Sequence, residues 1–327
     1  MLSTILNNIF SVTHQNFPAL VETCFHFQYQ YNPIYNQWCH LLQSSDVAHK
    51  NNIETIPYLP ISFFKTKKIT TTEFNATAIF ESSGTTQTIN SKHFVKDIGI
   101  YESSFLKAFT QQYGNINQWC IVGLLPSYLE RNNSSLVVMV QKLIELSNHP
   151  KSGFYLNNFQ ALATTLTELE AAKQPTLLIG VTFALLDFAE QFPMQLQYTN
   201  IMETGGMKGR RRELIRDEVH ELLQLKFGVQ SIHSEYGMTE LLSQAYSKGN
   251  GRFTCPPWMK ILVRNEEDPL QVSTTGRGIL NVIDLANIYS CCFIATEDAG
   301  IVYEDGSFEV LGRVDNSDIR GCSLMVS

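Results

Sequence analysis

Short apolar runs alternate with longer segments of helical periodicity between residues 76 and 246, and this alternation constrains the fold more than any other feature. The apolar runs have the length of buried strands, and the helical segments are long enough to cross between neighbouring strands of one sheet. The successive strand and helix candidates are 78–80 and 94–112, 119–125 and 136–146, 177–180 and 183–192, and 200–202 and 213–227, before a last run at 229–233. We therefore predict an α/β core in which crossover helices flank a sheet.

The segments on either side of this core have a different character. Residues 1–75 are rich in aromatic residues and predict irregular helices. After residue 247, Gly and Pro separate short β-prone runs. We predict three parts: a helical N-terminal segment over 1–75, the α/β core over 76–246, and a smaller β-rich lobe over 247–327.

The charge balance argues against nucleic acid as a partner. The 327 residues include 24 basic and 31 acidic side chains, a formal charge of -7, which repels a phosphate backbone. One basic cluster, 208–212, is too short to follow a nucleic-acid backbone but could meet a smaller anion. The hydrophobic fraction of 44% and charged fraction of 17% indicate a globular protein.

Cysteine usage and the N-terminal sequence bear on the compartment. The seven cysteines are odd in number and include no C-x-x-C pair, which favours a reducing compartment. The N-terminus lacks the basic start and apolar run of a signal peptide. The longest apolar stretch, 176–186, is shorter than the ~20 residues that cross a bilayer. We expect a cytoplasmic protein with no membrane span.

Three common site motifs are absent from the sequence. No Gly-Lys-Ser/Thr follows a glycine at the spacing of a Walker loop, and no G-x-G-x-x-G occurs. The segment from His220 to Gln224 departs from the zinc helix pattern because its last residue is Gln rather than His.

A hydroxyl-rich turn, Ser82-Ser83-Gly84-Thr85-Thr86-Gln87, follows the apolar run at 78–80. Backbone N–H groups and hydroxyls in such a turn can donate to phosphate oxygens, and the helix that follows favours an anion at its start. The alternative is an ordinary Ser/Thr turn that caps this helix.

A second candidate, Ser234-Glu235-Tyr236-Gly237-Met238-Thr239-Glu240, follows the β-prone run at 229–233. Glycine permits a sharp turn, the tyrosine ring can stack on a base, threonine can donate to a phosphate, and Glu240 can hold Mg²⁺. The alternative for Glu240 is a solvated carboxylate at a helix start.

These two segments, in this order, resemble the phosphate loop and the Tyr-Gly-x-Thr-Glu motif of the adenylate-forming superfamily of acyl-CoA synthetases, adenylation domains and luciferases. Glu203-Thr204-Gly205-Gly206 resembles the glycine turn of the adenine pocket. Ala295-Thr296-Glu297-Asp298 resembles the segment whose aspartate holds the ribose hydroxyls. Gly312-Arg313-Val314-Asp315, with 319–321, resembles the hinge motif that ends the large domain.

The resemblance is closer to the acyl-protein synthetase (LuxE-type) branch, which is related to phenylacetate-CoA ligases. Residues 125–131 with 133–135, and 205–210, are similar to signatures of that branch. Its members activate a fatty acid with ATP, carry the acyl group on a cysteine near the C-terminus and pass it to a reductase. Cys322 stands at the matching position, where Arg320 could favour a nucleophilic thiolate; the alternative is a small apolar residue in a terminal strand.

The resemblance implies the fold of an adenylate-forming large domain, with a nucleotide-binding α/β core, and assigns roles residue by residue. It implies Thr239, Glu240 and Cys322 as catalytic residues and Glu240 as the Mg²⁺ ligand. The residues that it implies for ATP are Ser82, Ser83, Gly84, Thr85, Thr86, Gly205, Gly206, Tyr236, Gly237, Asp298 and Arg313.

Two departures from the superfamily pattern affect the chemistry. Gln87 replaces a usual glycine, and the basic residue expected soon after it is displaced to Lys92. The sequence also stops shortly after the hinge motif, so we expect the small C-terminal domain and its catalytic lysine to be absent. Mg²⁺ on Glu240 would then offset the phosphate charge, alone or with the basic residues Lys208, Arg210 and Arg211.

The resemblance predicts ATP-dependent activation of a fatty or aromatic carboxylic acid as an acyl-adenylate, then transfer to a protein cysteine. Two alternatives stay open: a ligase that transfers the acyl group to coenzyme A or a carrier protein, and a degenerate nucleotide-binding subunit of a partner reductase. In the first, Cys322 is structural. The second is suggested by Gln87 and the missing lysine domain.

Overall fold

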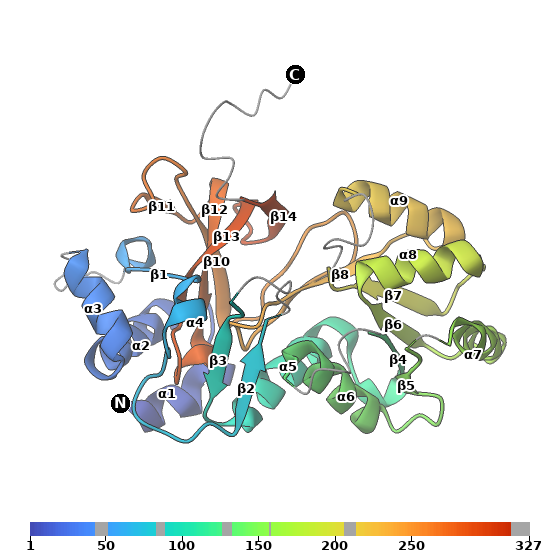
Figure 1. Cartoon of the computed structure of the whole chain (residues 1–327), viewed down its shortest axis with the longest axis horizontal. Coiled ribbons are helices and arrows are strands. Elements are labelled where there is room, and N and C mark those ends of the chain that lie inside the picture. Colours follow the sequence, from blue (N-terminus) through green and yellow to red (C-terminus); the bar gives the residue numbers. More distant parts are fainter. Residues whose placement is uncertain (43–51, 83–88, 126–132, 157, 206–213, 315–327) are drawn as a thin grey trace.

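The computed structural model describes residues 1–42, 52–82, 89–125, 133–156, 158–205 and 214–314. In this part of the chain, two six-stranded sheets lie side by side with a two-stranded hairpin between them (Figure 1). Helices α1 to α3 lie beside one sheet, and α5 to α9 surround the other (Figure 1). The fold is α/β, as the alternation of apolar runs and helical segments predicts.

The sheet of the α/β core has the strand order β5-β4-β6-β7-β8-β9 among the described residues. All neighbouring strands are parallel except β8 and β9, which are antiparallel. The strands are β4 (Cys120–Leu124), β5 (Gly153–Phe154), β6 (Thr176–Gly180), β7 (Thr199–Glu203), β8 (His233–Tyr236) and β9 (Ala245–Ser247). Both faces of β4 and β6 are buried, which explains their continuous apolar sequences.

Helices cover both faces of this sheet (Figure 1). They are α5 (Ile98–Tyr113), α6 (Ser135–Ser147), α7 (Phe159–Ala171), α8 (Thr182–Gln191) and α9 (Arg216–Phe227). Local sequence sets several of their ends. The Asp97 side chain accepts from Gly99 N at 2.9 Å where α5 begins, and the Ser134 hydroxyl accepts from Val137 N at 3.4 Å where α6 begins. Helix α9 ends at Gly228, whose φ of +65° suits a residue without a Cβ.

The second sheet has the order β1-β13-β12-β10-β11 in the described part of the chain. Strand β14 also pairs with β13, in the antiparallel sense, over residues 298–302 of β13. Its strands are β1 (Leu59–Pro60), β10 (Met259–Arg264), β11 (Val272–Ser273), β12 (Gly276–Asp284), β13 (Phe293–Val302) and β14 (Phe308–Arg313). Five of these six strands come from the region predicted to be rich in β structure.

Four α-helices lie in the described N-terminal part of the chain, and two of them, α2 and α3, pack against Phe293 of the second sheet through Phe25 and Tyr35. The four are α1 (Leu2–Asn8), α2 (Phe17–Tyr31), α3 (Pro33–Leu41) and α4 (Phe63–Thr66). Buried Gln28 donates to the carbonyl oxygens of Asn287 and Ile288 at 3.0 Å each, and its own oxygen accepts from Cys292 N at 2.8 Å. Strand β1 is parallel to β13, so part of residues 1–75 belongs to the sheet of the lobe. The division into three parts stays a prediction.

Two element boundaries differ from the sequence-based expectation. The run at 78–80 forms β2 (Ala78–Glu81), which pairs in a hairpin with β3 (Lys92–Val95) instead of joining the parallel sheet. Helix α5 therefore begins at Ile98 rather than Phe94, because Phe94 pairs with Ile79. Strand β8 begins where the expected strand ends, at His233, since this residue pairs with Met202 of β7.

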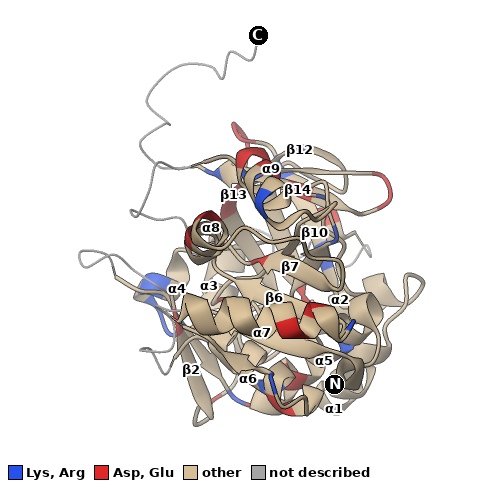
Figure 2. Cartoon of the chain, turned by 90° about the vertical axis from the view of Figure 1, so that its right-hand side faces the viewer, with Lys and Arg blue, Asp and Glu red and all other residues tan. Residues whose placement is uncertain are grey.

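No helix among residues 1–42, 52–82, 89–125, 133–156, 158–205 and 214–314 has the length and apolar character to span a bilayer. On the face that includes α7, α8 and α9, acidic and basic segments of the ribbon are interspersed (Figure 2). This mixed pattern agrees with the modest formal charge of -7.

Candidate active site

The predicted site residues gather where parallel strands of the core sheet end. Gly180, Glu203 and Tyr236 are the last residues of β6, β7 and β8. Ligands of open α/β sheets bind beyond the carboxyl ends of their strands. Strands β13 and β14 of the second sheet approach this edge, because Tyr236 contacts Asp298.

Tyr236, Asp298 and Arg313 form a connected set. The tyrosine hydroxyl donates to Asp298 Oδ2 at 2.9 Å, and Arg313 Nε lies 3.4 Å from Asp298 Oδ1. Burial, and then the charge of Asp298, hold the pKa of Tyr236 well above its usual value, so the hydroxyl keeps its proton. The structure thus brings together three residues that the sequence assigned to the nucleotide.

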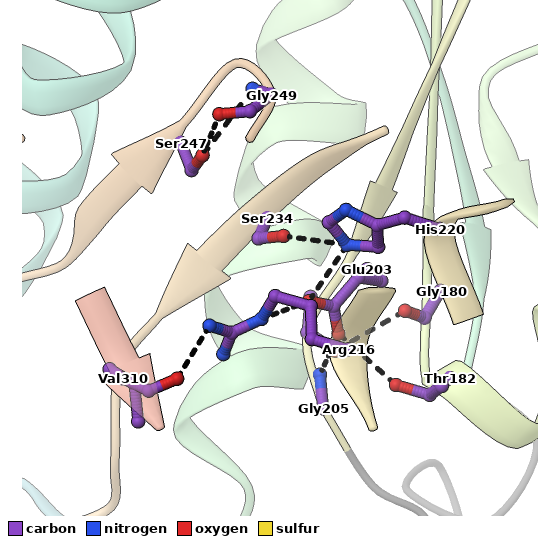
Figure 3. A network of polar contacts seen from close by, with 11 residues as sticks. Gly180, Thr182, Glu203, Gly205, Arg216, His220, Ser234, Ser247, Gly249 and Val310 are labelled. Atoms are coloured by element: carbon purple, nitrogen blue, oxygen red, sulfur yellow. Dashed lines mark hydrogen bonds and ion pairs between the residues drawn. The ribbon is translucent and has the colours of Figure 1, made fainter. Parts of the chain in front are cut away.

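The glycine turn after β7 is held by the carboxylate of Glu203. Gly205 has a φ of +74°, and its N–H donates to Glu203 Oε2 at 2.8 Å. The Thr182 hydroxyl donates to the same oxygen at 3.1 Å (Figure 3). Thr182 N donates to the Gly205 carbonyl at 3.0 Å. These bonds fix the turn against the start of α8, while Gly206 lies outside the described residues.

Arg216 and His220 face the other oxygen of Glu203. Arg216 Nε lies 3.8 Å and His220 Nε2 3.7 Å from Oε1, and the Ser234 hydroxyl lies 3.4 Å from the same histidine nitrogen (Figure 3). Burial alone would raise the pKa of Glu203. His220, the charge of Arg216 and the Gly205 N–H outweigh burial and lower this pKa to about 2. Glu203 therefore stays ionised at neutral pH.

Neighbouring elements hold the loop that carries Thr239 and Glu240. His93 Nδ1 of β3 lies 2.9 Å from the Thr239 carbonyl oxygen, which can only accept, so this nitrogen donates. Burial lowers the pKa of His93 to about 4, and the ring is neutral at pH 7. Asn287 Nδ2 donates to the Glu240 carbonyl at 2.7 Å. His93 and Asn287, which lie outside the loop, therefore hold the backbone of Thr239 and Glu240.

Asp284, the last residue of β12, holds the next part of the same loop. It is fully buried and accepts from Leu242 N at 2.8 Å, Ser243 N at 3.0 Å and the Ser243 hydroxyl at 2.6 Å. Burial raises the pKa of Asp284 to about 6, although these donors favour the ionised form. Asp284 therefore connects the second sheet to the loop of the core.

The Glu240 side chain is a buried carboxylate that could serve as a ligand of a cation. Only 6% of the residue is exposed, and burial raises the pKa of its carboxyl against the opposing effects of Ser91, Arg313 and Lys65. Magnesium sites often use one or two carboxylates together with substrate phosphates. The described ranges contain no cluster of three or more His, Cys, Asp or Glu side chains that could hold a metal alone.

Several predicted residues fall outside the described part of the chain. These are Ser83, Gly84, Thr85, Thr86, Gln87, Gly206, Lys208, Arg210, Arg211, Arg320 and Cys322. Ser82, at the start of the hydroxyl-rich turn, accepts from Ser91 N at 2.9 Å and so closes the hairpin of β2 and β3. Lys92, the displaced basic residue, lies 3.4 Å from Glu81 across the same hairpin. A Cβ at Gly237 would meet the end of the Glu235 side chain, which would have to shift.

Sequence reasoning did not identify Arg216, His93, Asp284 and Asn287. All four act through contacts between segments far apart in the chain. The one available signal was Asp284, a carboxylate at the end of a largely apolar strand, since a buried charge in such a place needs partners.

Comparisons with known proteins agree with this architecture. A family model described as "Acyl-protein synthetase, LuxE" matches residues 12–327. The long-chain-fatty-acid–luciferin-component ligase of Aliivibrio fischeri is 25% identical over 336 residues, covering 94% of this chain and 87% of the relative. The enzyme of the same name from Vibrio harveyi is 24% identical over 333 residues, covering 94% and 86%.

Solved structures with the same fold are more distant in sequence. An open form of 2-hydroxyisobutyryl-CoA ligase has a TM-score of 0.65 and 10% identity, covering 92% of this chain and 70% of that one. ATP-bound MatB from Rhodopseudomonas palustris has a TM-score of 0.55 and 16% identity, covering 72% of this chain. The matched region spans about half of the MatB chain, 48%.

The fold is that of the large domain of adenylate-forming enzymes. Within that class, the chain belongs to the acyl-protein synthetase (LuxE) family, whose model covers nearly its whole length.

Proposed function

We propose that this protein uses ATP to activate a long-chain fatty acid as an acyl-adenylate and then transfers the acyl group to a cysteine. The observation that carries the proposal is the meeting of Tyr236, Asp298 and Arg313 with the Glu203–Gly205 turn, in a chain of the LuxE family. The choice of acid follows the two relatives, which are named as long-chain-fatty-acid ligases.

The arrangement of described residues suggests a binding mode for ATP. The Tyr236 ring and the turn at Gly205 and Gly206 frame the adenine, and Asp298 with Arg313 binds the ribose. Asp298 can serve this purpose because a carboxylate has lone pairs beyond those used by Tyr236 and Arg313. We assign the phosphates to Thr239 and to the hydroxyl-rich turn, Ser82, Ser83, Gly84, Thr85 and Thr86.

We propose Glu240 as the ligand of a Mg²⁺ ion. A bound Mg²⁺ would offset the negative charge of the phosphates next to the carboxylate of the acid. Burial raises the pKa of the Glu240 carboxyl despite the opposing charges of Arg313 and Lys65, and a bound cation would further stabilise its ionised form.

The proposed reaction has two steps. An oxygen of the fatty acid carboxylate attacks the α-phosphorus, the bond to the β-phosphate oxygen breaks, and pyrophosphate leaves. A thiolate next attacks the carbonyl carbon of the acyl-adenylate, AMP leaves with the bonding electron pair, and a thioester remains.

We propose Cys322 as the thiol that accepts the acyl group. Of the six cysteines in the described ranges, Cys24, Cys39, Cys120, Cys291 and Cys292 are buried and Cys255 is half-buried. Burial raises the pKa of Cys39 to about 12 and also raises those of Cys255 and Cys291, so these thiols stay protonated. Cys322 lies outside the described residues, and its assignment rests on its match to the family position.

Mass spectrometry of the intact protein tests the transfer step. The protein is incubated with ATP, Mg²⁺ and a series of straight-chain fatty acids, and the modified peptide is then sequenced. We expect one acyl group on the wild-type protein and none on Cys322→Ser, while Cys255→Ser stays acylated. An acyl group that persists on Cys322→Ser would rule out Cys322 as the acceptor.

The acyl group would next pass to a partner. We propose a reductase or a carrier as this acceptor and the cytoplasm as the location, since a thioester is an activated acyl donor and a free acceptor thiol needs a reducing environment.

A further inference from the structure

Arg216, the first residue of α9, contacts elements from both sheets. Its Nε lies 3.8 Å from Glu203 Oε1, at the end of β7, and its Nη1 donates to the Val310 carbonyl of β14 at 2.8 Å (Figure 3). Its guanidinium carbon lies 5.1 Å from the centre of the Phe253 ring. One side chain therefore spans from the core sheet to the lobe.

On the core side, Arg216 contacts the residue that fixes the glycine turn. Glu203 Oε2 accepts from Gly205 N and from the Thr182 hydroxyl, while Oε1 faces Arg216 and His220. The Glu203 carboxylate therefore contacts both Arg216 and Gly205, which is part of the proposed adenine site.

On the lobe side, Arg216 contacts two elements that lead to the proposed ribose site. Strand β14 carries both Val310 and, three residues later, Arg313, which lies 3.4 Å from Asp298. The ring of Phe253 stacks on Phe308 at 5.3 Å, and Phe308 packs edge-on against Tyr236 at 5.3 Å. Each route ends at a residue of the Tyr236, Asp298 and Arg313 set.

Local helix energetics do not account for an arginine at this position. The start of a helix carries a partial positive charge, which disfavours a basic side chain. The acidic residues Asp217 and Glu218 occupy the same first turn, as that charge favours. Side-chain exposures of 27% for Arg216 and 9% for Glu203 make the pair less screened than a surface ion pair.

We propose that Arg216 is a positioning residue for the nucleotide: it connects the Glu203–Gly205 turn to β14 and so holds the adenine and ribose contacts at a fixed separation. This inference rests on the proposed use of ATP. Binding groups that are fixed before the ligand arrives lose less entropy on binding. Without the bridge, the turn and β14 would each keep their own contacts but lose their fixed relative placement.

Three variants and one control test the proposal: Arg216→Ala, Arg216→Gln, Arg216→Lys and Arg252→Ala. Arg252 is a suitable control because it also contacts residues next to β14. Its Nε donates to the Ser307 hydroxyl at 2.9 Å, and its guanidinium carbon lies 3.9 Å from the centre of the Tyr303 ring, so these contacts do not reach Glu203. ATP affinity is measured by calorimetry without fatty acid. The KM for ATP, the KM for the acid and kcat are then measured by pyrophosphate exchange.

We expect Arg216→Ala and Arg216→Gln to weaken ATP binding roughly tenfold and to raise the KM for ATP by a similar factor, with little change in the KM for the acid. Lysine should restore only part of the affinity, because an ammonium lacks the planar fork of donors that spans Val310 and Glu203. Arg252→Ala should match the wild type.

A purely structural role for Arg216 would lower the midpoint of urea unfolding and leave the affinity of the folded fraction for ATP unchanged. That result, or full recovery with lysine, would overturn the inference. Absence of ATP binding by the wild-type protein would instead defeat the proposed function. The two failures are therefore distinct, and Arg216→Lys keeps the test valid if the alanine variant does not fold.

Discussion

Two glutamates on adjacent strands, Glu203 and Glu235, have opposite pKa shifts. Donors surround Glu203, and its pKa is lowered to about 2 despite burial. Burial, and then the negative charge of Glu203, raise the pKa of Glu235 to about 8. The tyrosines Tyr101 and Tyr246 lie close enough to Glu235 for its charge to raise their own pKa values. Burial, together with the carboxylate that stabilises the glycine turn, therefore keeps Glu235 protonated at neutral pH.

Glu235→Gln should change how stability depends on pH. In the unfolded chain, Glu235 ionises at its usual pKa near 4.5, whereas the folded protein retains the proton up to about 8. The unfolded state thus binds fewer protons between these values, and wild-type stability falls as pH rises through this window. Relative to the wild type, the glutamine variant should gain on the order of 2 kcal/mol between pH 5 and pH 8, after allowance for partial solvent contact.

Urea unfolding at pH 5, 6.5 and 8 measures this difference. Glu221→Gln, an exposed glutamate on α9, serves as the control and should parallel the wild type at each pH. Parallel curves for Glu235→Gln and the wild type would contradict the shifted pKa of Glu235.

At the scale of elements, the loop from Gly237 to Gln244 depends on strands that are distant in sequence. Residues from β3, β12 and the short helix η5 (Leu285–Asn287) hold its backbone. The sequence predicted the glycine turn and the glutamate in this loop, because both follow from local residue types. It could not predict the supports, since they form only when the β2–β3 hairpin and the second sheet pack against the core.

Asp284→Asn tests the support from β12. An asparagine side chain has one acceptor oxygen and would direct an amide donor toward N–H groups of the loop, leaving at least one of them unpaired. We expect a loss of about 2–4 kcal/mol in the free energy of unfolding by urea. The exposed Asp305, which accepts from Ser307 N at 3.0 Å, offers a control, and Asp305→Asn should cost much less than Asp284→Asn.

One outcome would contradict the prediction for Asp284. Equal, small losses for Asp284→Asn and Asp305→Asn would show that the three hydrogen bonds from the loop to Asp284 do not stabilise it. The predicted difference comes from burial, because an unpaired group costs little where water can replace the lost partner.

Element boundaries show what local pattern can and cannot predict. Apolar runs correctly located β4, β6 and β7, because each is followed by a clear helical pattern. The β2 run was also recognised, yet its partner was not: β3 includes Lys92 and His93, which do not read as a buried strand. The sequence also did not predict where β8 begins, because pairing with Met202 and Glu203 fixes this strand rather than its own residues.

At the scale of the whole molecule, the proposed site lies where two sheets meet. The core sheet provides the glycine turn and Tyr236, and the lobe provides Asp298 and Arg313. The resemblance in sequence anticipated this set, but not its connections through Arg216. It also did not anticipate that α2 stabilises the lobe, where Gln28 satisfies backbone groups of residues 287–292 from 259 or more positions away.

The most direct test of acid activation is the exchange of labelled pyrophosphate into ATP, with Glu240→Gln as the matched variant. The account predicts exchange by the wild-type protein that requires both Mg²⁺ and a long-chain fatty acid, and at least a hundredfold loss in Glu240→Gln. Folded wild-type protein that binds ATP but shows no exchange with any fatty or aromatic acid would contradict it.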